Sequence, residues 1–150
     1  MQNYLDLVRK VYQEGFDRPD RTGTGTRTLL NQTLQFDLTN SFPLVTTKRT
    51  YWKGVVEELL WFLRGETNIK SLQEKGVHIW DEWADDRGEL GPVYGKQWRD
   101  FNCSGIDQIE TALHLLRTDP FSRRNIVSAW NPGVLPSTDY TPSYNATIGN

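Results

Sequence analysis

The stretch from His78 to Arg99, HIWDEWADDRGELGPVYGKQWR, restricts the possible fold more than any other part of this sequence. It places three of the chain's six tryptophans, a tyrosine, five acidic and three basic residues within 22 positions. Glycine and proline interrupt it, and neither a strand period nor a helix period is sustained. Large aromatic side chains on irregular backbone are costly to leave in water. Either another part of the chain covers them, or they form the wall of a ligand site.

The composition is that of one cytoplasmic domain. With 150 residues, 37% hydrophobic residues and a net charge of −2, the chain can bury one core and has no basic excess for nucleic acid. Its single cysteine, Cys103, excludes an intramolecular disulfide and a multi-cysteine metal site, and fits a reducing compartment. No apolar run approaches the ~18 residues of a membrane helix, and the N-terminus lacks the apolar core of a signal peptide. We therefore expect no nucleic-acid partner and no membrane partner.

Apolar spacing predicts helices and strands in a mixed order, which is typical of an α+β domain. Glycine follows several of the predicted helices, as expected at helix ends. A loop is predicted over residues 16–26. The predicted helices cover about residues 4–12, 51–64, 69–75 and 106–117, and the predicted strands cover about residues 30–38 and 125–130.

The predicted helix over residues 51–64 is apolar around most of its circumference, which is typical of a helix inside a larger structure. At 100° per residue, Trp61 faces away from the main apolar arc, and Glu57 and Glu58 lie just outside its two edges. One of these two carboxylates should therefore be partly removed from water, which raises its pKa. The apolar arc consists of Trp52, Val55, Val56, Leu59, Leu60, Phe62 and Leu63.

Three basic sites are candidates for binding an anion such as phosphate. Arg21 lies in DRTGTGT, where glycines expose backbone N–H groups, although such a segment is also an ordinary turn. Lys48 and Arg49 precede the predicted main helix, and Arg123 and Arg124 precede a predicted strand. Basic residues at the ends of elements are commonly only solvated, so both interpretations are open. The two histidines have no partner at metal-ligand spacing, and we predict no metal site.

Taken together, these stretches resemble the thymidylate synthase family. The resemblance covers about residues 2–135 and follows the order of the family's motifs. It implies an α+β fold with a large sheet that forms the dimer face. On this reading, residues 1–150 are the N-terminal portion of a single domain. The matching segments are DRTGTGT (20–26), FPLVTTKR (42–49), EELLWFLRGETN (57–68), IWDEWADDRGELGPVYGKQWRDF (79–101) and SRRNIVSAWNP (122–132).

The resemblance implies reductive methylation of dUMP to dTMP. The co-substrate 5,10-methylenetetrahydrofolate supplies both the one-carbon unit and a hydride, and a cysteine thiolate attacks C6 of the uracil. By resemblance, Glu58 organises water and proton transfers beside the pyrimidine, and Tyr94 lies near the nucleophile. No metal is implied.

The resemblance also assigns binding roles. Arg21 would hold the nucleotide phosphate, whereas Arg123 and Arg124 would reach the phosphate bound in the partner subunit of a homodimer. Tyr51 occupies a folate-side position at which many members have histidine. The folate-binding residues by resemblance are Lys48, Arg49, Tyr51, Ile79, Trp80 and Trp83.

The motif match is lost after Leu135, and residues 136–150 are interpreted as a divergent tail. The family places its nucleophile in a Pro-Cys-His segment, and the corresponding count reaches Ser143, a poor substitute for a thiolate. Cys103 precedes the predicted 106–117 helix and is not at that position. We therefore expect a truncated domain, explained by a frameshift, a shortened gene prediction or a split gene. This chain alone should be inactive and poorly soluble, with Trp61, Val127 and Trp130 partly exposed.

Two other functions stay open. A pyrimidine-nucleotide hydroxymethylase on the same scaffold would use water in place of the folate hydride, although the IWDEW segment favours the synthase. A non-catalytic module that binds nucleotide or folate would need no nucleophile.

Overall fold

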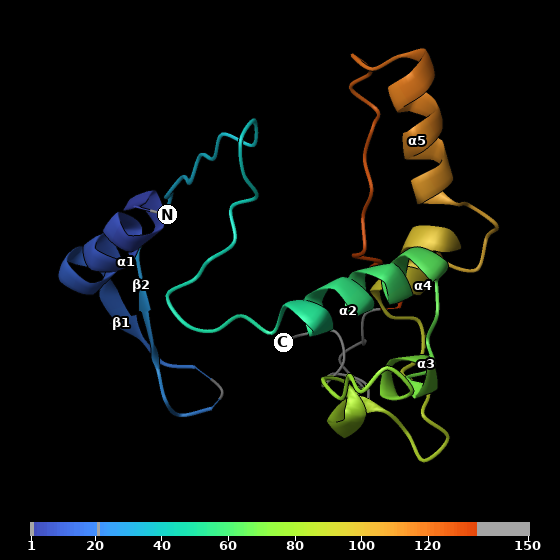
Figure 1. Cartoon of the computed structure of the whole chain (residues 1–150), viewed down its shortest axis with the longest axis horizontal. Coiled ribbons are helices and arrows are strands. Elements are labelled where there is room, and N and C mark those ends of the chain that lie inside the picture. The colour runs from blue at the N-terminus through green and yellow to red at the C-terminus, as the bar shows by residue number, and fades with distance from the viewer. Residues whose placement is uncertain (1, 21, 135–150) are drawn as a thin grey trace. The chain divides into compact units, whose positions relative to one another are not determined.

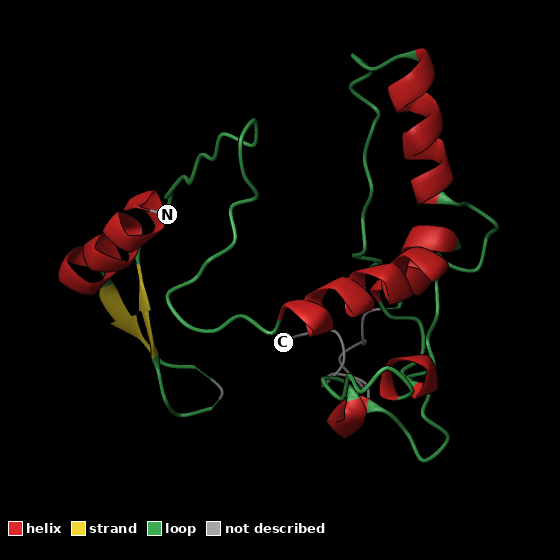
Figure 2. Cartoon of the chain, viewed as in Figure 1, coloured by secondary structure: helices red, strands yellow, loops and turns green. Residues whose placement is uncertain are grey.

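The structure is a computed structural model in which residues 2–20 and 22–134 are described. The chain divides into two compact units, Met1–Thr50 and Tyr51–Asn150 (Figure 1). In its described part, the first unit contains a helix and a two-stranded antiparallel sheet, and the second unit contains helices (Figure 2). The prediction that the chain mixes α and β structure is therefore confirmed.

The first unit consists of α1 (Gln2–Glu14) followed by the hairpin of β1 (Phe16–Arg18) and β2 (Thr26–Thr28). The predicted helix and its end at Gly15 are confirmed. Gly15 is required by space, because a Cβ there would lie 2.4 Å from the carbonyl oxygen of Val11. The loop predicted over residues 16–26 is wrong at its ends, where the two strands pair. Asp20 closes the turn between them by accepting the backbone N–H groups of residues 22 and 25.

The strand predicted over residues 30–38 does not form in the structure. Its alternating side chains Leu30, Leu34 and Leu38 are exposed instead of packed on a core. An alternating pattern specifies a strand only where a neighbouring strand accepts its hydrogen bonds, and this segment pairs with neither β1 nor β2.

The second unit begins with α2 (Trp52–Arg64), which has nearly the bounds that the sequence predicts. Gly65 ends the helix in the left-handed conformation, with φ at +71°, and its N–H and the next one return to the carbonyls of Phe62 and Trp61. The remaining elements are α3 (Lys70–Gln73), the 3₁₀ turn η1 (Asp81–Trp83), α4 (Tyr94–Arg99) and α5 (Gln108–Thr118). Among the described helices, none combines the length and the apolar character that a membrane crossing requires.

Helix α4 is not predicted by the sequence, and the strand predicted over residues 125–130 does not form. The side chain of Gln108 explains the second error, because it acts as the hydrogen-bonding neighbour of this extended segment. Its Nε2 donates to the carbonyl oxygen of Ser128 at 2.8 Å, and its Oε1 accepts the N–H of Ser128 at 2.8 Å. One side-chain amide therefore satisfies a backbone position that a neighbouring strand would satisfy in a sheet.

The orientation predicted for α2 is wrong. Trp61, expected to face away from the buried side, is 0% exposed and is the largest side chain of the core. Its indole Nε1 donates to the carbonyl oxygen of Asn68 at 3.0 Å, just before α3. The core of the second unit is Trp61, Ile69, Leu72, Val77, Leu90 and Val93. Four residues of the predicted arc are instead 42–48% exposed: Trp52, Val55, Leu59 and Leu60.

Val127 and Trp130 are exposed, as the sequence analysis expects. The same expectation for Trp61 is wrong, because α3 and the segment after it bury this side chain without any further strand.

Candidate functional site

The central contact of the candidate site joins Glu58 on α2 to Trp80, which immediately precedes η1. The indole Nε1 of Trp80 donates a hydrogen bond to Oε1 of Glu58 at 2.8 Å. Burial raises the pKa of the Glu58 carboxyl above its ordinary value, and the Trp80 hydrogen bond opposes this by favouring the charged form. The expectation that one of the two neighbouring glutamates is desolvated is therefore confirmed for Glu58. Glu57 instead pairs with Lys75, with 2.6 Å between Oε2 and Nζ.

Aromatic rings surround this contact. Phe62, one turn after Glu58 on α2, lies edge-on to Trp80, Tyr94 and Trp98, at centroid distances of 6.3, 5.5 and 5.7 Å. The rings of Trp80 and Tyr94 are 6.4 Å apart. Edge-to-face pairs at these separations are favourable beyond the area that they bury. Trp80 and Tyr94 are each half-buried, so these rings are covered by packing and still present part of their surface.

The close approach of two helix backbones makes this cluster possible. Gly95 on α4 is buried, and a Cβ at this position would lie 2.7 Å from Cα of Phe62 and 2.8 Å from its carbonyl oxygen. A glycine that the sequence suggests as an interruption is therefore the contact point between α2 and α4. Because α4 begins at Tyr94, this contact also determines where the Tyr94 ring meets Phe62.

Of the other predicted folate-side residues of the second unit, Ile79 and Trp83 lie close to Trp80 in the sequence, and Tyr51 immediately precedes α2. Ile79 and Trp83 are exposed, and the hydroxyl of Tyr51 donates to the carbonyl oxygen of Gly76 at 3.0 Å. The structure thus brings Glu58, Trp80 and Tyr94 together, with Ile79 and Trp83 next to them in the chain. A half-buried indole, that of Trp80, beside the Glu58 carboxylate suits a flat heterocycle that carries N–H donors.

Of the predicted anion-binding residues, only Arg123 and Arg124 belong to the described part of the second unit. Arg123 and Arg124 are exposed in the turn that follows α5. Lys48 and Arg49 are exposed near the end of the first unit. Arg21 and Ser143, the position counted for the nucleophile, lie outside the described residues. Cys103 is exposed in the turn between α4 and α5, with φ at +54°.

A buried amide network that the sequence does not predict joins Asn131 to Gln97 on α4. Gln97 and Asn131 are 2% and 4% exposed, and Nδ2 of Asn131 donates to Oε1 of Gln97 at 2.9 Å. Asn131 also accepts the N–H of Gly133 at 2.9 Å, and Gln97 donates to the carbonyl oxygen of Pro92. These contacts leave a small cavity of about 10 Å³, room for about one water molecule. It is lined by Pro92, Val93, Tyr94, Ala129, Asn131 and Val134.

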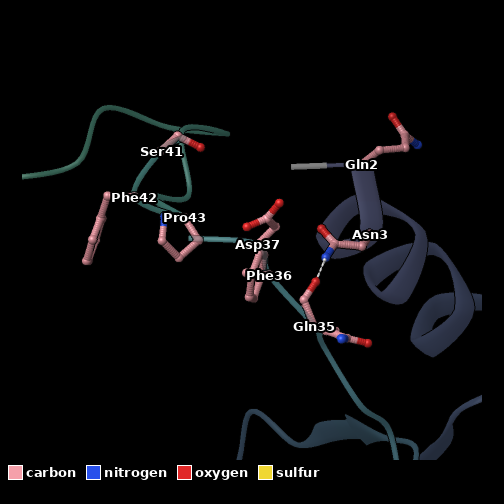
Figure 3. Close-up of a pocket in the computed structure, with 8 residues that line it drawn as sticks. All are labelled: Gln2, Asn3, Gln35, Phe36, Asp37, Ser41, Phe42 and Pro43. Atoms are coloured by element: carbon pink, nitrogen blue, oxygen red, sulfur yellow. Dashed lines mark hydrogen bonds between the residues drawn. The ribbon is translucent and has the colours of Figure 1, made fainter. Parts of the chain in front are cut away.

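The first unit contains a wider groove of about 430 Å³ that the sequence analysis did not anticipate (Figure 3). The side chain of Asn3, at the start of α1, reaches across to donate to the carbonyl oxygen of Gln35 at 2.7 Å. Asp37 lies in the same groove, and the Thr39 hydroxyl and N–H lower the pKa of its carboxyl. The groove is lined by Gln2, Asn3, Gln35, Phe36, Asp37, Ser41, Phe42 and Pro43.

Comparison with known proteins shows the family to which this chain belongs. The family described as thymidylate synthase matches residues 2–147, which extends past Leu135, where the motif comparison ended. A curated thymidylate synthase of Francisella philomiragia is 52% identical over all 150 residues of this chain and 55% of its own length. Another, from Francisella tularensis subsp. holarctica, is 53% identical over the same shares. The chain spans about half the length of these relatives. On this family match and this identity, the chain belongs to the thymidylate synthase family.

Proposed function

We propose that this chain supplies part of the active site for reductive methylation of dUMP to dTMP, with 5,10-methylenetetrahydrofolate as co-substrate. Family membership supports the reaction class. The single observation that carries the proposal is the hydrogen bond between the half-buried carboxylate of Glu58 and the indole of Trp80. This hydrogen bond joins the carboxylate proposed for proton transfer, Glu58, directly to an aromatic residue proposed to bind folate, Trp80.

Glu58 is the proposed proton-transfer residue. General acid–base catalysis is most efficient when the pKa of the group approaches the working pH, and burial shifts the pKa of Glu58 in that direction. The Trp80 N–H fixes one carboxylate oxygen, which leaves the other free to orient water beside the pyrimidine. Tyr94 is the second proposed catalytic residue, because its ring packs against both Phe62 and Trp80.

The proposed binding roles follow the family resemblance residue by residue. Arg21 would bind the nucleotide phosphate, with Arg123 and Arg124 acting on the phosphate in the partner subunit of a homodimer. Such a homodimer would use the large sheet of the family fold, and the protein would be cytoplasmic. The proposed folate-side residues are Lys48, Arg49, Tyr51, Ile79, Trp80 and Trp83, of which the tryptophans offer flat faces to the folate ring.

The position of the only cysteine supports a second candidate function. The only cysteine of the chain, Cys103, is exposed in the turn between α4 and α5, away from the position that the family resemblance gives to the nucleophile. The family reaction needs a cysteine thiolate to attack C6 of the uracil, and the sequence has serine at the counted position. This observation favours a chain that binds folate or nucleotide without turning it over by itself.

Equilibrium dialysis with folic acid, in the presence of dUMP, tests the proposal. We expect the wild-type chain to bind folic acid and Trp80→Phe to bind it at least several-fold more weakly. Trp130→Phe, the same change at an exposed tryptophan, is the matched control and should bind like wild type. No binding, or equal binding by the wild type and Trp80→Phe, would refute the folate-side assignment.

A tritium-release assay with dUMP and methylenetetrahydrofolate separates the two candidate functions. No release by this chain, together with folic acid binding, supports the non-catalytic role for the chain by itself. Release that is lost in Ser143→Ala would instead show that the chain carries its own nucleophile. Turnover of dCMP in place of dUMP would favour the hydroxymethylase.

A further inference from the structure

Tyr51 makes a contact that reaches the candidate site through the backbone. Its hydroxyl donates to the carbonyl oxygen of Gly76 at 3.0 Å, a contact that spans 25 positions in the sequence. Tyr51 immediately precedes α2, whereas Gly76 follows α3 with φ at +68°. The hydrogen bond therefore fastens the start of one helix to the turn that follows another.

The ring of Tyr51 is aimed at this carbonyl by the residue beneath it. Gly54 is buried, and a Cβ at this position would lie 2.5 Å from both Cδ1 and Cε1 of Tyr51. The ring lies directly on the bare backbone of the first turn of α2. Because a tyrosine has only two side-chain torsions and this surface restricts the ring, little freedom is lost when the hydroxyl binds.

The position of the Gly76 carbonyl can affect the position of the Trp80 side chain, because only three residues separate Gly76 from Trp80. Val77, the next residue, is buried in the core, and its N–H donates to the carbonyl oxygen of Leu72 at 2.9 Å. Trp80 follows three residues later. The chain from Val77 to Trp80 is thus anchored at one end by the core and by the Tyr51 hydroxyl, and at the other end by Glu58.

A second contact on the same turn is less suited to this role. Lys75 pairs with Glu57 at 2.6 Å, but both side chains are partly exposed. A partly exposed ion pair between long side chains is screened by water and leaves the backbone free to move. Tyr51 is also 50% exposed, but its hydroxyl binds a backbone oxygen directly and its ring is held against Gly54.

We infer that Tyr51 is a positioning residue, whose hydroxyl holds the Gly76 turn so that the Trp80 indole meets the Glu58 carboxylate. The inference deepens the proposed function and rests on it for its catalytic meaning, since it concerns the same site. It assigns to Tyr51 a role that acts through Trp80, without requiring the hydroxyl to touch a ligand.

Tyr51→Phe tests this role, because it keeps the ring on Gly54 and removes only the hydroxyl. NMR of the full 150-residue chain measures how fast the Trp80 indole hydrogen exchanges with water. Loss of one net hydrogen bond predicts exchange that is faster by about 2- to 10-fold. The pH titration of the Glu58 carboxyl should shift upward in the same variant, because its hydrogen bond from Trp80 is weakened. Incorporation of 4-aminophenylalanine at position 51, which restores an N–H donor, should return both values toward wild type.

Two control variants separate positioning from general destabilisation. Glu57→Gln breaks the neighbouring ion pair with Lys75, and Tyr12→Phe removes an exposed hydroxyl from α1. Both should leave Trp80 exchange at the wild-type rate. The inference is overturned if Tyr51→Phe leaves Trp80 exchange and the Glu58 titration unchanged. It is also overturned if the core amide of Val77 accelerates by the same factor as the indole.

These readouts need no ligand. A chain that does not bind folic acid would therefore refute the proposed function, while Trp80 exchange would still decide the role of Tyr51.

Discussion

Removal of the indole donor from the Glu58 contact should raise the proton affinity of that carboxylate about tenfold. Trp80→Phe deletes the N–H that lies 2.8 Å from Glu58 Oε1 and retains an aromatic ring against Phe62. A hydrogen bond to a charged group contributes about 1.5–3 kcal/mol. Because Glu58 is only half-buried, the lower end of that range applies. A free-energy change of about 1.4 kcal/mol corresponds to a tenfold change in the proton-binding constant. The lost donor favoured the ionised form, so the pKa of Glu58 should rise above its wild-type value.

A pH titration followed by ¹³C NMR of the glutamate carboxyl carbons, with Glu58 assigned by Glu58→Gln, measures this shift. Trp98→Phe is the matched control, since it makes the same change to another ring that packs on Phe62. We expect the Glu58 midpoint to move upward in Trp80→Phe and to stay in place in Trp98→Phe. An unchanged or lower midpoint in Trp80→Phe, or equal movement in the two variants, would refute the argument.

Three further predictions concern stability. Gly95→Ala should lower the free energy of unfolding by about 1–3 kcal/mol in urea, because its Cβ would meet the Phe62 backbone at 2.7 Å. A rise instead would mean that helix propensity outweighs the clash. Asn131→Ala should cost about 1–3 kcal/mol by removing one partner of Gln97, and an unchanged urea midpoint would contradict this. Burial raises the pKa of Glu58 above its ordinary 4.5, so its contribution to stability is present below that pH and is lost as the pH rises through the folded-state pKa. Melting temperatures across this pH range should fall less in Glu58→Gln than in wild type, and parallel curves would contradict the prediction.

The sequence predicts helix ends well where the residues that form the cap lie within the helix or directly next to it. The end of α2 at Gly65 follows from a left-handed cap that the last turn of the helix creates by itself. The helix α5 begins after Asp107, whose side chain accepts the N–H of Glu110 at 2.8 Å. Both signals lie within a few residues of the feature that they specify, so no distant partner is needed to read them.

Features that depend on distant partners are predicted poorly. The apolar residues of α2 alone predict that Trp61 faces away from the buried side of the helix. The prediction is wrong because Leu72 and Val77, which lie outside α2, pack in one core with Trp61. Gly95 was interpreted as an interruption of regular structure, whereas it marks the contact of two helices. The extended segment around Ser128 has strand-like residues, but its hydrogen bonds go to a side chain. Each error has the same cause, which is a tertiary contact that the local pattern does not contain.

The candidate site divides in the same way. The prediction that one of the two adjacent glutamates is desolvated follows from their positions at the edges of the apolar arc of α2, and the structure identifies Glu58 as that residue. Family resemblance predicts a folate-side role for Trp80, and the structure joins this residue to Glu58 by a hydrogen bond of 2.8 Å. The amides of Gln97 and Asn131 carried no signal in the sequence, because polar residues of this type are mostly exposed.

NMR of the six tryptophan indole N–H signals during a folic acid titration tests the central claim most directly, since each indole reports on its own surroundings. The account predicts that the signals of Trp80 and Trp83 shift first and saturate together, while the signal of Trp130 stays in place. Glu58→Gln should reduce the shift at Trp80. Shifts that are confined to Trp130, or no shift at any indole at saturating folic acid, would contradict a folate-facing wall at Glu58 and Trp80.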